Sequence, residues 1–321
     1  MISIIIATDR RPHEIKECLE SLKGQSLLPD EIIIAHGGSD AETEETVNSL
    51  VINNDLKVRL KYYNIGPLGA AVQRNKGAEK ATGDILLFLD DDVLAEPDFI
   101  KEITSVFEKD PERKIAGVSG TIVNQTYTRL RRINKFLFDI SLRKGERRAS
   151  YAGKVVGPAV NFLPEDKRLA EAEQAVDWLP SCCSAYRKDI FLEYEFNKNF
   201  KGYSFMEDVE LSSRIGKKYR LINTSKARCF HKDLGGRTHK SWIFVEKMKV
   251  LNRWYVMTKV LEKYSLGDKI RFFYYQIVYC TLAEINFVKK RPDIKNKLAR
   301  LTGRLWGIFS ILALSQKAKN L

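Results

Sequence analysis

Short apolar runs alternate with segments of helical periodicity over the first 123 residues, and this alternation constrains the fold more than any other feature. Apolar runs predict strands at residues 2–7, 32–35, 58–63, 85–89 and 115–123. Helical spacing predicts helices at residues 12–23, 42–50, 69–80 and 97–109. A strand that is apolar throughout, such as 85–89, is typical of parallel sheets buried on both faces. The order therefore predicts an α/β fold with an open, mostly parallel sheet flanked by helices.

The pattern is less regular after Asn124. It predicts a basic amphipathic helix at 130–142, a strand at 178–186, helices at 188–194 and 207–219, and a strand near Leu221. From Trp242 onward the sequence is helical and basic, in about three segments divided near Leu266 and Pro292. We therefore expect a main α/β domain at residues 1–235 and a basic helical extension at residues 236–321.

The chain carries a formal net charge of +13, and the excess is unevenly placed. Residues 241–321 hold 16 Lys and Arg against 5 Asp and Glu, and residues 127–150 hold 8 against 2. A basic skew implies an anionic partner, such as a nucleotide, a nucleic acid or a membrane surface; a solvated face is the simpler alternative. The apolar stretches at 270–288 and 301–314 contain charges, so they predict interfacial amphipathic helices rather than spans.

The five cysteines indicate a reducing compartment. None lies in a CxxC or CxxH spacing, so neither a zinc site nor a disulfide framework is signalled. The apolar run that follows Met1 is too short for a signal peptide and has no basic start. We therefore expect a cytoplasmic protein.

Acidic side chains follow the fourth predicted strand, at the edge of the sheet where open α/β folds bind ligands. Three consecutive carboxylates, Asp90, Asp91 and Asp92, would repel one another there without a cation. Mg²⁺ or Mn²⁺ prefers oxygen ligands and would supply the charge. Since alternate residues of an extended segment point the same way, Asp90 and Asp92 can face one site while Asp91 faces away.

The usual phosphate-binding loops are absent. The sequence contains no GxxxxGK[ST], and the first predicted βα turn, residues 7–12, has no glycine. Phosphates would instead be held by the metal and by cations such as Arg74, which lies in a helix entered through Gly69.

A second acidic pair, Glu207 and Asp208, opens the predicted helix 207–219. Acids are common at helix starts because they interact favourably with the dipole, so capping is the simpler interpretation. Transfer to a hydroxyl group, however, needs a general base opposite the metal, and this pair could supply it. His231 could complete the metal shell, or it could be a packed histidine.

Four motifs occur in one order along residues 1–235: Ser3–Thr8 with Arg11-Pro12; Gly69–Gly77 with Gly83-Asp84; Phe88-Leu89-Asp90-Asp91-Asp92; and Trp178–Arg187 followed by Phe205–Leu211. Jointly they resemble the family-2 class of inverting glycosyltransferases, with the GT-A fold and its DxD motif. The resemblance implies a nucleotide-sugar-binding catalytic domain over residues 1–235.

The resemblance also implies roles for individual residues. Asp92 would bind the metal directly, Asp90 would hold the ribose or a metal-bound water, and His231 would be a third metal ligand. Asp208 would deprotonate the acceptor hydroxyl, with Glu207 beside it. The residues that would line the nucleotide-sugar site are Ala7, Thr8, Asp9, His36, Gly69, Arg74, Asp90 and Asp91.

Two positions depart from the family pattern. His36 stands where the family has an aspartate that contacts the nucleobase, and Asp9-Arg10 replaces its Tyr-Asn. The sequence therefore does not decide whether the donor carries UDP, dTDP or GDP. The expected partners are a nucleoside-diphosphate sugar and a hydroxyl acceptor, either lipid-linked or a polysaccharide, with no nucleic acid and with an oligomer allowed.

Two alternatives remain. A sugar-phosphate nucleotidylyltransferase should show a glycine-rich turn after the first strand. A basic membrane- or nucleic-acid-binding protein on a degenerate GT-A fold would leave two acidic clusters unexplained. The basic C-terminal helices favour docking on the cytoplasmic face of a membrane near a lipid-linked acceptor; a helical cap or a dimer interface is the other use for them.

Overall fold

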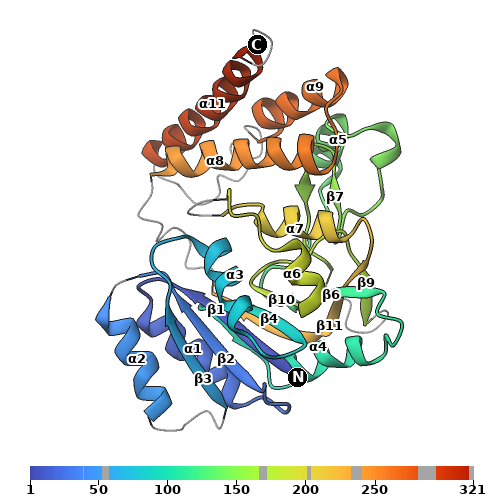
Figure 1. Cartoon of the computed structure of the whole chain (residues 1–321). Helices are drawn as coiled ribbons and strands as arrows, with labels where there is room; N and C mark the ends of the chain where they lie inside the picture. Colours follow the sequence, from blue (N-terminus) through green and yellow to red (C-terminus); the bar gives the residue numbers. More distant parts are fainter. Residues whose placement is uncertain are drawn as a thin grey trace. The chain divides into compact units, whose positions relative to one another are not determined.

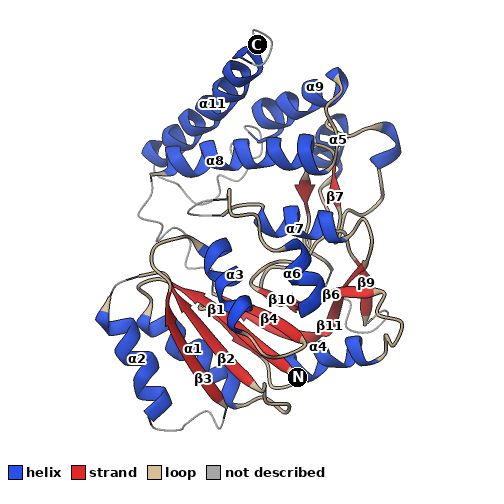
Figure 2. Cartoon of the chain, in the orientation of Figure 1, coloured by secondary structure: helices blue, strands red, loops and turns tan. Residues whose placement is uncertain are grey.

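The computed structural model describes residues 1–38, 40–52, 58–165, 172–200, 204–232, 241–280 and 294–317. The chain forms two compact units: residues 1–127 with 163–235, and residues 128–162 with 236–321. The first unit contains the large sheet, and most of the second is helical (Figure 2). Residues 128–162 lie within the expected domain 1–235 but group with the C-terminal helices, so the expected domain division stays a prediction.

The sheet of the first unit has nine strands, in the order β3-β2-β1-β4-β10-β6-β11-β5 with β9 beside β11 (Figure 1). The bounds are β1 Ile2–Thr8, β2 Glu31–His36, β3 Arg59–Asn64, β4 Ile85–Asp90, β5 Val93–Ala95, β6 Ile115–Ile122, β9 Glu173–Ala175, β10 Cys183–Arg187 and β11 Arg220–His231. Strands β1 to β4 pair in parallel, as do β6 and β11, whereas β10 runs antiparallel between β4 and β6. The expected open, mostly parallel sheet is confirmed.

Helices cover both faces of this sheet. One face packs against α1 (Pro12–Lys23), α2 (Ala41–Ile52) and α4 (Phe99–Glu108), and the other against α3 (Ala70–Lys80), α6 (Lys188–Tyr194) and α7 (Glu207–Ile215). Every strand and helix predicted before residue 124 is present, with its ends shifted by at most two residues. Most of these predictions succeed because the apolar run is buried, as in β1, β2, β4 and β6, whereas the edge strand β3 is only partly buried.

In strand β1, successive side chains pack against opposite faces of the sheet. Ile4 and Ile6 belong to the core beneath α1, whereas Ile5 belongs to the core beneath α3, because successive side chains of a strand point to opposite faces. Gly77 lets α3 approach closely: a Cβ there would lie 2.5 Å from Cγ2 of Ile5. Replacing this glycine would force α3 away from the strand that carries Thr8.

Two later predictions need correction. The strand expected at 178–186 is shorter and begins at Cys183. Pro180 has no amide hydrogen to give to a strand ladder, and its carbonyl instead accepts a turn hydrogen bond from the Cys183 amide. The helix expected at 207–219 ends at Ile215.

The second unit contains α5 (Arg132–Ile140) and a hairpin of β7 (Val155–Val156) and β8 (Val160–Asn161). Its C-terminal part contains α8 (Trp242–Tyr255), α9 (Leu266–Tyr274) and α11 (Ile294–Lys317), and α8 and α9 continue as the π-helical turns η2 (Val256–Val260) and η3 (Tyr275–Tyr279). The expected basic helical segment is thus present. The division expected near Pro292 lies outside the described residues. None of the described helices combines the length and the apolar character needed to cross a membrane.

Candidate active site

The carboxyl ends of three parallel strands meet at one edge of the sheet. In register, Ala7 of β1 lies beside Asp90 of β4, and Thr8 lies beside His36 of β2. The polar residues that follow these strands are therefore neighbours, although they are far apart in the sequence. This edge is where open α/β sheets bind ligands.

The acidic triplet turns the chain from β4 into the short strand β5. Asp90 ends β4, and Asp91 and Asp92 form the turn before Val93. Strand β5 pairs with the end of β11 and places His231 opposite Val93. This pairing brings His231 to the triplet. Three residues are too few to give a recognisable strand pattern, so the sequence did not predict β5.

Asp90, Asp92 and His231 can converge on one metal ion. Their ligand atoms all lie within 4.8 Å of one another, and Nε2 of His231 is 3.0 Å from Oδ1 of Asp92. That oxygen is buried and forms an ion pair with the protonated imidazole. Two carboxylates and one imidazole are suitable ligands for Mn²⁺ or Mg²⁺, so these residues fit the metal that the sequence predicts.

The proton of His231 balances the charge of Asp92 when no cation is bound. Burial alone would lower the pKa of the imidazole, but the hydrogen bonds with Asp92 and Cys182, together with the charge of Asp90, outweigh burial and raise this pKa to about 11. Burial likewise tends to raise the pKa of Asp92, but His231 and Arg11 together lower it. A divalent cation must therefore displace the imidazole proton in order to use this ring as a ligand.

Asp91 points away from this group and holds the first strand. Its carboxylate is buried and accepts hydrogen bonds from Oγ1 of Thr8 at 2.7 Å and from Nη1 of Arg11 at 2.8 Å. Arg11 also donates to Asp92 at 3.2 Å. Burial raises the pKa of Asp91 to about 7. The sequence did not identify Arg11 as a site residue; its place in the first βα turn was the available signal.

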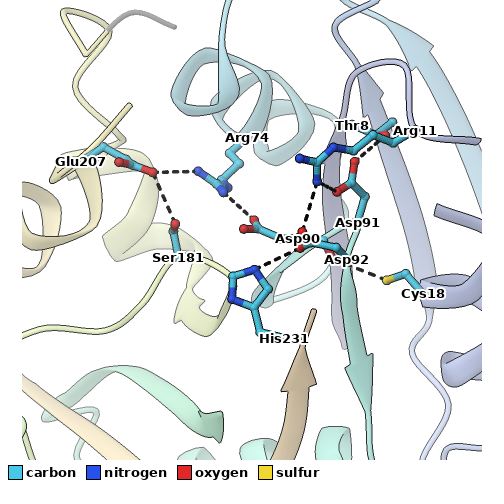
Figure 3. Close-up of polar contacts among 10 residues, drawn as sticks. All are labelled: Thr8, Arg11, Cys18, Arg74, Asp90, Asp91, Asp92, Ser181, Glu207 and His231. Atoms are coloured by element: carbon cyan, nitrogen blue, oxygen red, sulfur yellow. Dashed lines mark hydrogen bonds and ion pairs between the residues drawn. The ribbon is translucent and has the colours of Figure 1, made fainter. Parts of the chain in front are cut away.

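Arg74 bridges the two acidic clusters (Figure 3). Its buried guanidinium donates from Nη2 to Asp90 at 2.6 Å and from Nη1 to Glu207 at 3.1 Å. The sequence predicted that Thr8 and Arg74 contact the nucleotide. In this structure Thr8 donates to Asp91, and Arg74 donates to Asp90 and Glu207. Arg74 neutralises charge that the triplet and the α7 pair would otherwise leave facing each other.

Glu207 and Asp208 lie at the first turn of α7, immediately after a strained residue. Met206 is buried and adopts a left-handed backbone with φ of 76°, a conformation that is uncommon outside glycine and frequent at functional sites. Glu207 also accepts from the Ser181 hydroxyl at 3.4 Å, and Asp208 accepts from the Val209 amide at 2.7 Å. Burial raises the pKa of both carboxyl groups, and the charge of Asp208 adds to the rise at Glu207.

His36 is fully buried at the end of β2. Its Nδ1 lies 2.6 Å from the hydroxyl of Tyr62 and its Nε2 lies 3.0 Å from Oδ1 of Asp40. Both ring nitrogens therefore have protein partners. Asp9 is exposed beside this group and pairs with Arg10. Ligand atoms of Asp9, His36 and Asp40 lie within 4.8 Å of one another at this strand end, and His36 contacts Asp40 directly.

Removing the bridging cation should destabilise the first unit. We expect Arg74→Met to lower the free energy of unfolding by about 3 kcal/mol, because Glu207 is left buried without a counter-ion. Arg74→Met combined with Glu207→Gln should recover part of this loss. Urea unfolding measures both. The matched control is Lys76→Met on the exposed side of the same helix. If Arg74→Met and Lys76→Met lowered the free energy of unfolding equally, Arg74 would not stabilise the unit by bridging Asp90 and Glu207.

The site combines a group of side chains at the strand ends that could hold a metal ion with an acidic pair at the start of α7, in a mostly parallel sheet. This arrangement defines the GT-A class of glycosyltransferases. Residues 3–194 match the family model described as Glycosyl transferase family 2. Because this match spans more than half of the chain, the chain belongs to that family and is a glycosyltransferase that acts on a nucleotide-sugar donor.

Individual relatives agree with this assignment. The chain is 26% identical over 253 residues to a glucosyl-dolichyl phosphate glucuronosyltransferase of Haloferax volcanii, an alignment covering 75% of this chain and 72% of the relative. The fold of this chain resembles that of the mannosyltransferase PcManGT of Pyrobaculum calidifontis in complex with GDP-Man and Mn²⁺ (TM-score 0.54, 14% identity, covering 97% of this chain and 86% of that one). It also resembles GalNAc-T7 with UDP, GalNAc and Mn²⁺ (TM-score 0.55, 14% identity, 88% and 57%).

Proposed function

We propose that this glycosyltransferase inverts the anomeric carbon of its donor sugar in a single displacement, with Asp208 as the general base. The observation that carries the proposal is the pair of acidic groups on either side of Arg74. Asp90, Asp92 and His231 form one group, and Glu207 and Asp208 form the other. A base on one side and a cation site on the other is the arrangement that in-line attack by a hydroxyl requires.

The residues have separate tasks in this proposal. Asp208 accepts the proton of the acceptor hydroxyl as the bond to the anomeric carbon forms, and its raised pKa makes it a stronger base than an ordinary aspartate. Arg74 keeps Glu207 in place beside it. Asp90, Asp92 and His231 would hold Mn²⁺ or Mg²⁺, which when bound supplies positive charge for the departing diphosphate. In this proposal the nucleotide-sugar site is lined by Ala7, Thr8, Asp9, His36, Gly69 and Asp91.

The relatives and the basic charge of the chain support a proposal for the acceptor and the location. A relative whose name includes dolichyl phosphate supports a lipid-linked acceptor here. We therefore propose a peripheral protein at the cytoplasmic face of a membrane, acting in glycan or polysaccharide synthesis.

A donor panel tests this function. We expect one of a set of UDP-, dTDP- and GDP-sugars to be hydrolysed slowly without acceptor, with activity lost in EDTA and restored by Mn²⁺. Released nucleoside diphosphate is the measurement. A nucleoside triphosphate with a sugar phosphate is the control, since pyrophosphate from that pair would indicate a nucleotidylyltransferase. Absence of both nucleotide binding and hydrolysis across the panel would overturn the proposal.

A further inference from the structure

We infer that the second unit binds an anionic lipid bilayer through α5 and the basic segment that follows it, with α9 beside them. The inference identifies the surface that would contact the proposed membrane. The sequence had predicted that the C-terminal helices make this contact. The inference rests on the proposed function only for its purpose, because it concerns binding and its test needs no turnover.

Helix α5 exposes an apolar stripe while its other side is fixed in the core of the unit. Ile133, Phe136 and Ile140 are 71%, 66% and 42% exposed, and their spacing puts them on one face of a helix. Phe138 is fully buried, with its ring 5.3 Å from those of Tyr151 and Phe162. The buried ring anchors the helix, so the exposed stripe is held outward by packing.

The surface around this stripe is basic. Residues 128–162 contain nine Lys and Arg against two acids. Both acids are already paired within the unit: Asp139 accepts from Lys135 and from the Tyr151 hydroxyl, and Glu146 is paired with Lys263. The salt bridges among the described residues include none for five exposed cations, namely Arg131, Arg132, Lys144, Arg147 and Arg148. Their charge is available to an anionic partner.

Helix α9 lies next to α5 and extends the same chemistry. The Tyr274 hydroxyl donates to the Leu137 carbonyl at 3.0 Å, and Arg143 binds Asp268 with two hydrogen bonds of 2.8 and 2.5 Å. Leu266 and Ile270 are 75% and 61% exposed on α9. The pair of helices thus carries large apolar side chains among cations.

A bilayer surface fits this combination better than other partners do. Phosphate groups of a nucleic acid would use the cations but leave Phe136 and its neighbours in water. At a membrane, apolar side chains enter the boundary between headgroups and acyl chains while Lys and Arg meet anionic lipids. A second copy of the chain would bring like charge against like charge.

Vesicle sedimentation with the full chain tests the surface, using phosphatidylglycerol mixed into phosphatidylcholine. Arg131→Gln with Arg132→Gln should weaken binding on the order of 25-fold, since each cation contributes about fivefold. Phe136→Ser should weaken it roughly tenfold. The matched control removes the same charge from exposed positions of the first unit, Lys101→Gln with Lys109→Gln, and should bind within about twofold of the wild type.

Several outcomes would overturn the inference. The inference is wrong if the wild-type chain does not sediment with anionic vesicles at low salt. It is also wrong if the α5 variants bind vesicles as strongly as the Lys101→Gln, Lys109→Gln control. Loss of binding only in Leu305→Ser with Phe309→Ser would move the surface to α11. Dimers in sedimentation velocity that Phe136→Ser dissociates would make this face a contact between copies. Donor hydrolysis in solution should stay unchanged in the α5 variants, so failure of the donor panel and failure of vesicle binding are separate results.

Discussion

Asp208→Asn should lower kcat on the order of a thousandfold, while the affinity for the donor nucleotide stays within about threefold of wild type. The amide keeps the size of the side chain but cannot accept the proton of an acceptor hydroxyl. Steady-state transfer kinetics and nucleotide titration separate the two effects. Asp189→Asn on α6, whose side chain is 64% exposed, is the matched control and should leave kcat unchanged. A fully active Asp208→Asn enzyme would remove this residue from the role of base.

The pH profile of the wild-type enzyme should carry the same signature. Burial raises the pKa of Asp208 to about 6, so the carboxylate needed for catalysis is lost as the pH falls through that value. We therefore expect kcat to decline towards acid with a midpoint near pH 6. Glu207 is adjacent and its pKa is also raised, so the midpoint belongs to the pair. A profile that stays flat down to pH 5 would contradict this assignment.

Asp92→Asn should abolish the response to divalent metal, with Mn²⁺ affinity reduced at least about a hundredfold. Asp92 contributes a buried carboxylate oxygen that faces His231, and an amide cannot replace its charge. Calorimetric titration with Mn²⁺ measures this without substrate. The control is Asp98→Asn, an exposed carboxyl at the start of α4.

The wild-type titration also has an expected pH dependence. Because the pKa of His231 is raised to about 11 in the cation-free protein, metal binding must release the imidazole proton. Mn²⁺ affinity should therefore increase with pH, and His231→Ala should flatten the increase. Unchanged Mn²⁺ affinity in Asp92→Asn would place the metal elsewhere.

The sequence by itself determined the sheet and its strongest site feature. Strands such as Ile85–Asp90 are apolar on both faces because helices cover both faces of the sheet. The apolar residues that this burial requires are consecutive in the sequence, so the strand can be recognised from the sequence alone. The acidic triplet was predictable for the same reason: it follows an unmistakable buried strand. The acids at the start of α7 were visible as well, although helix capping explained them equally well.

Only the tertiary structure decided how these pieces are joined. His231 reaches Asp92 because a three-residue strand, β5, pairs with the end of β11. Arg74 binds both Asp90 and Glu207, the second of which lies 133 residues further along the chain, and Asp91 accepts hydrogen bonds from Thr8 and Arg11. Residues 128–162 group with the C-terminal helices. Periodicity reports which face of an element is buried, but it carries no information on which distant side chain will neutralise a buried charge, because that pairing depends on register and packing between elements.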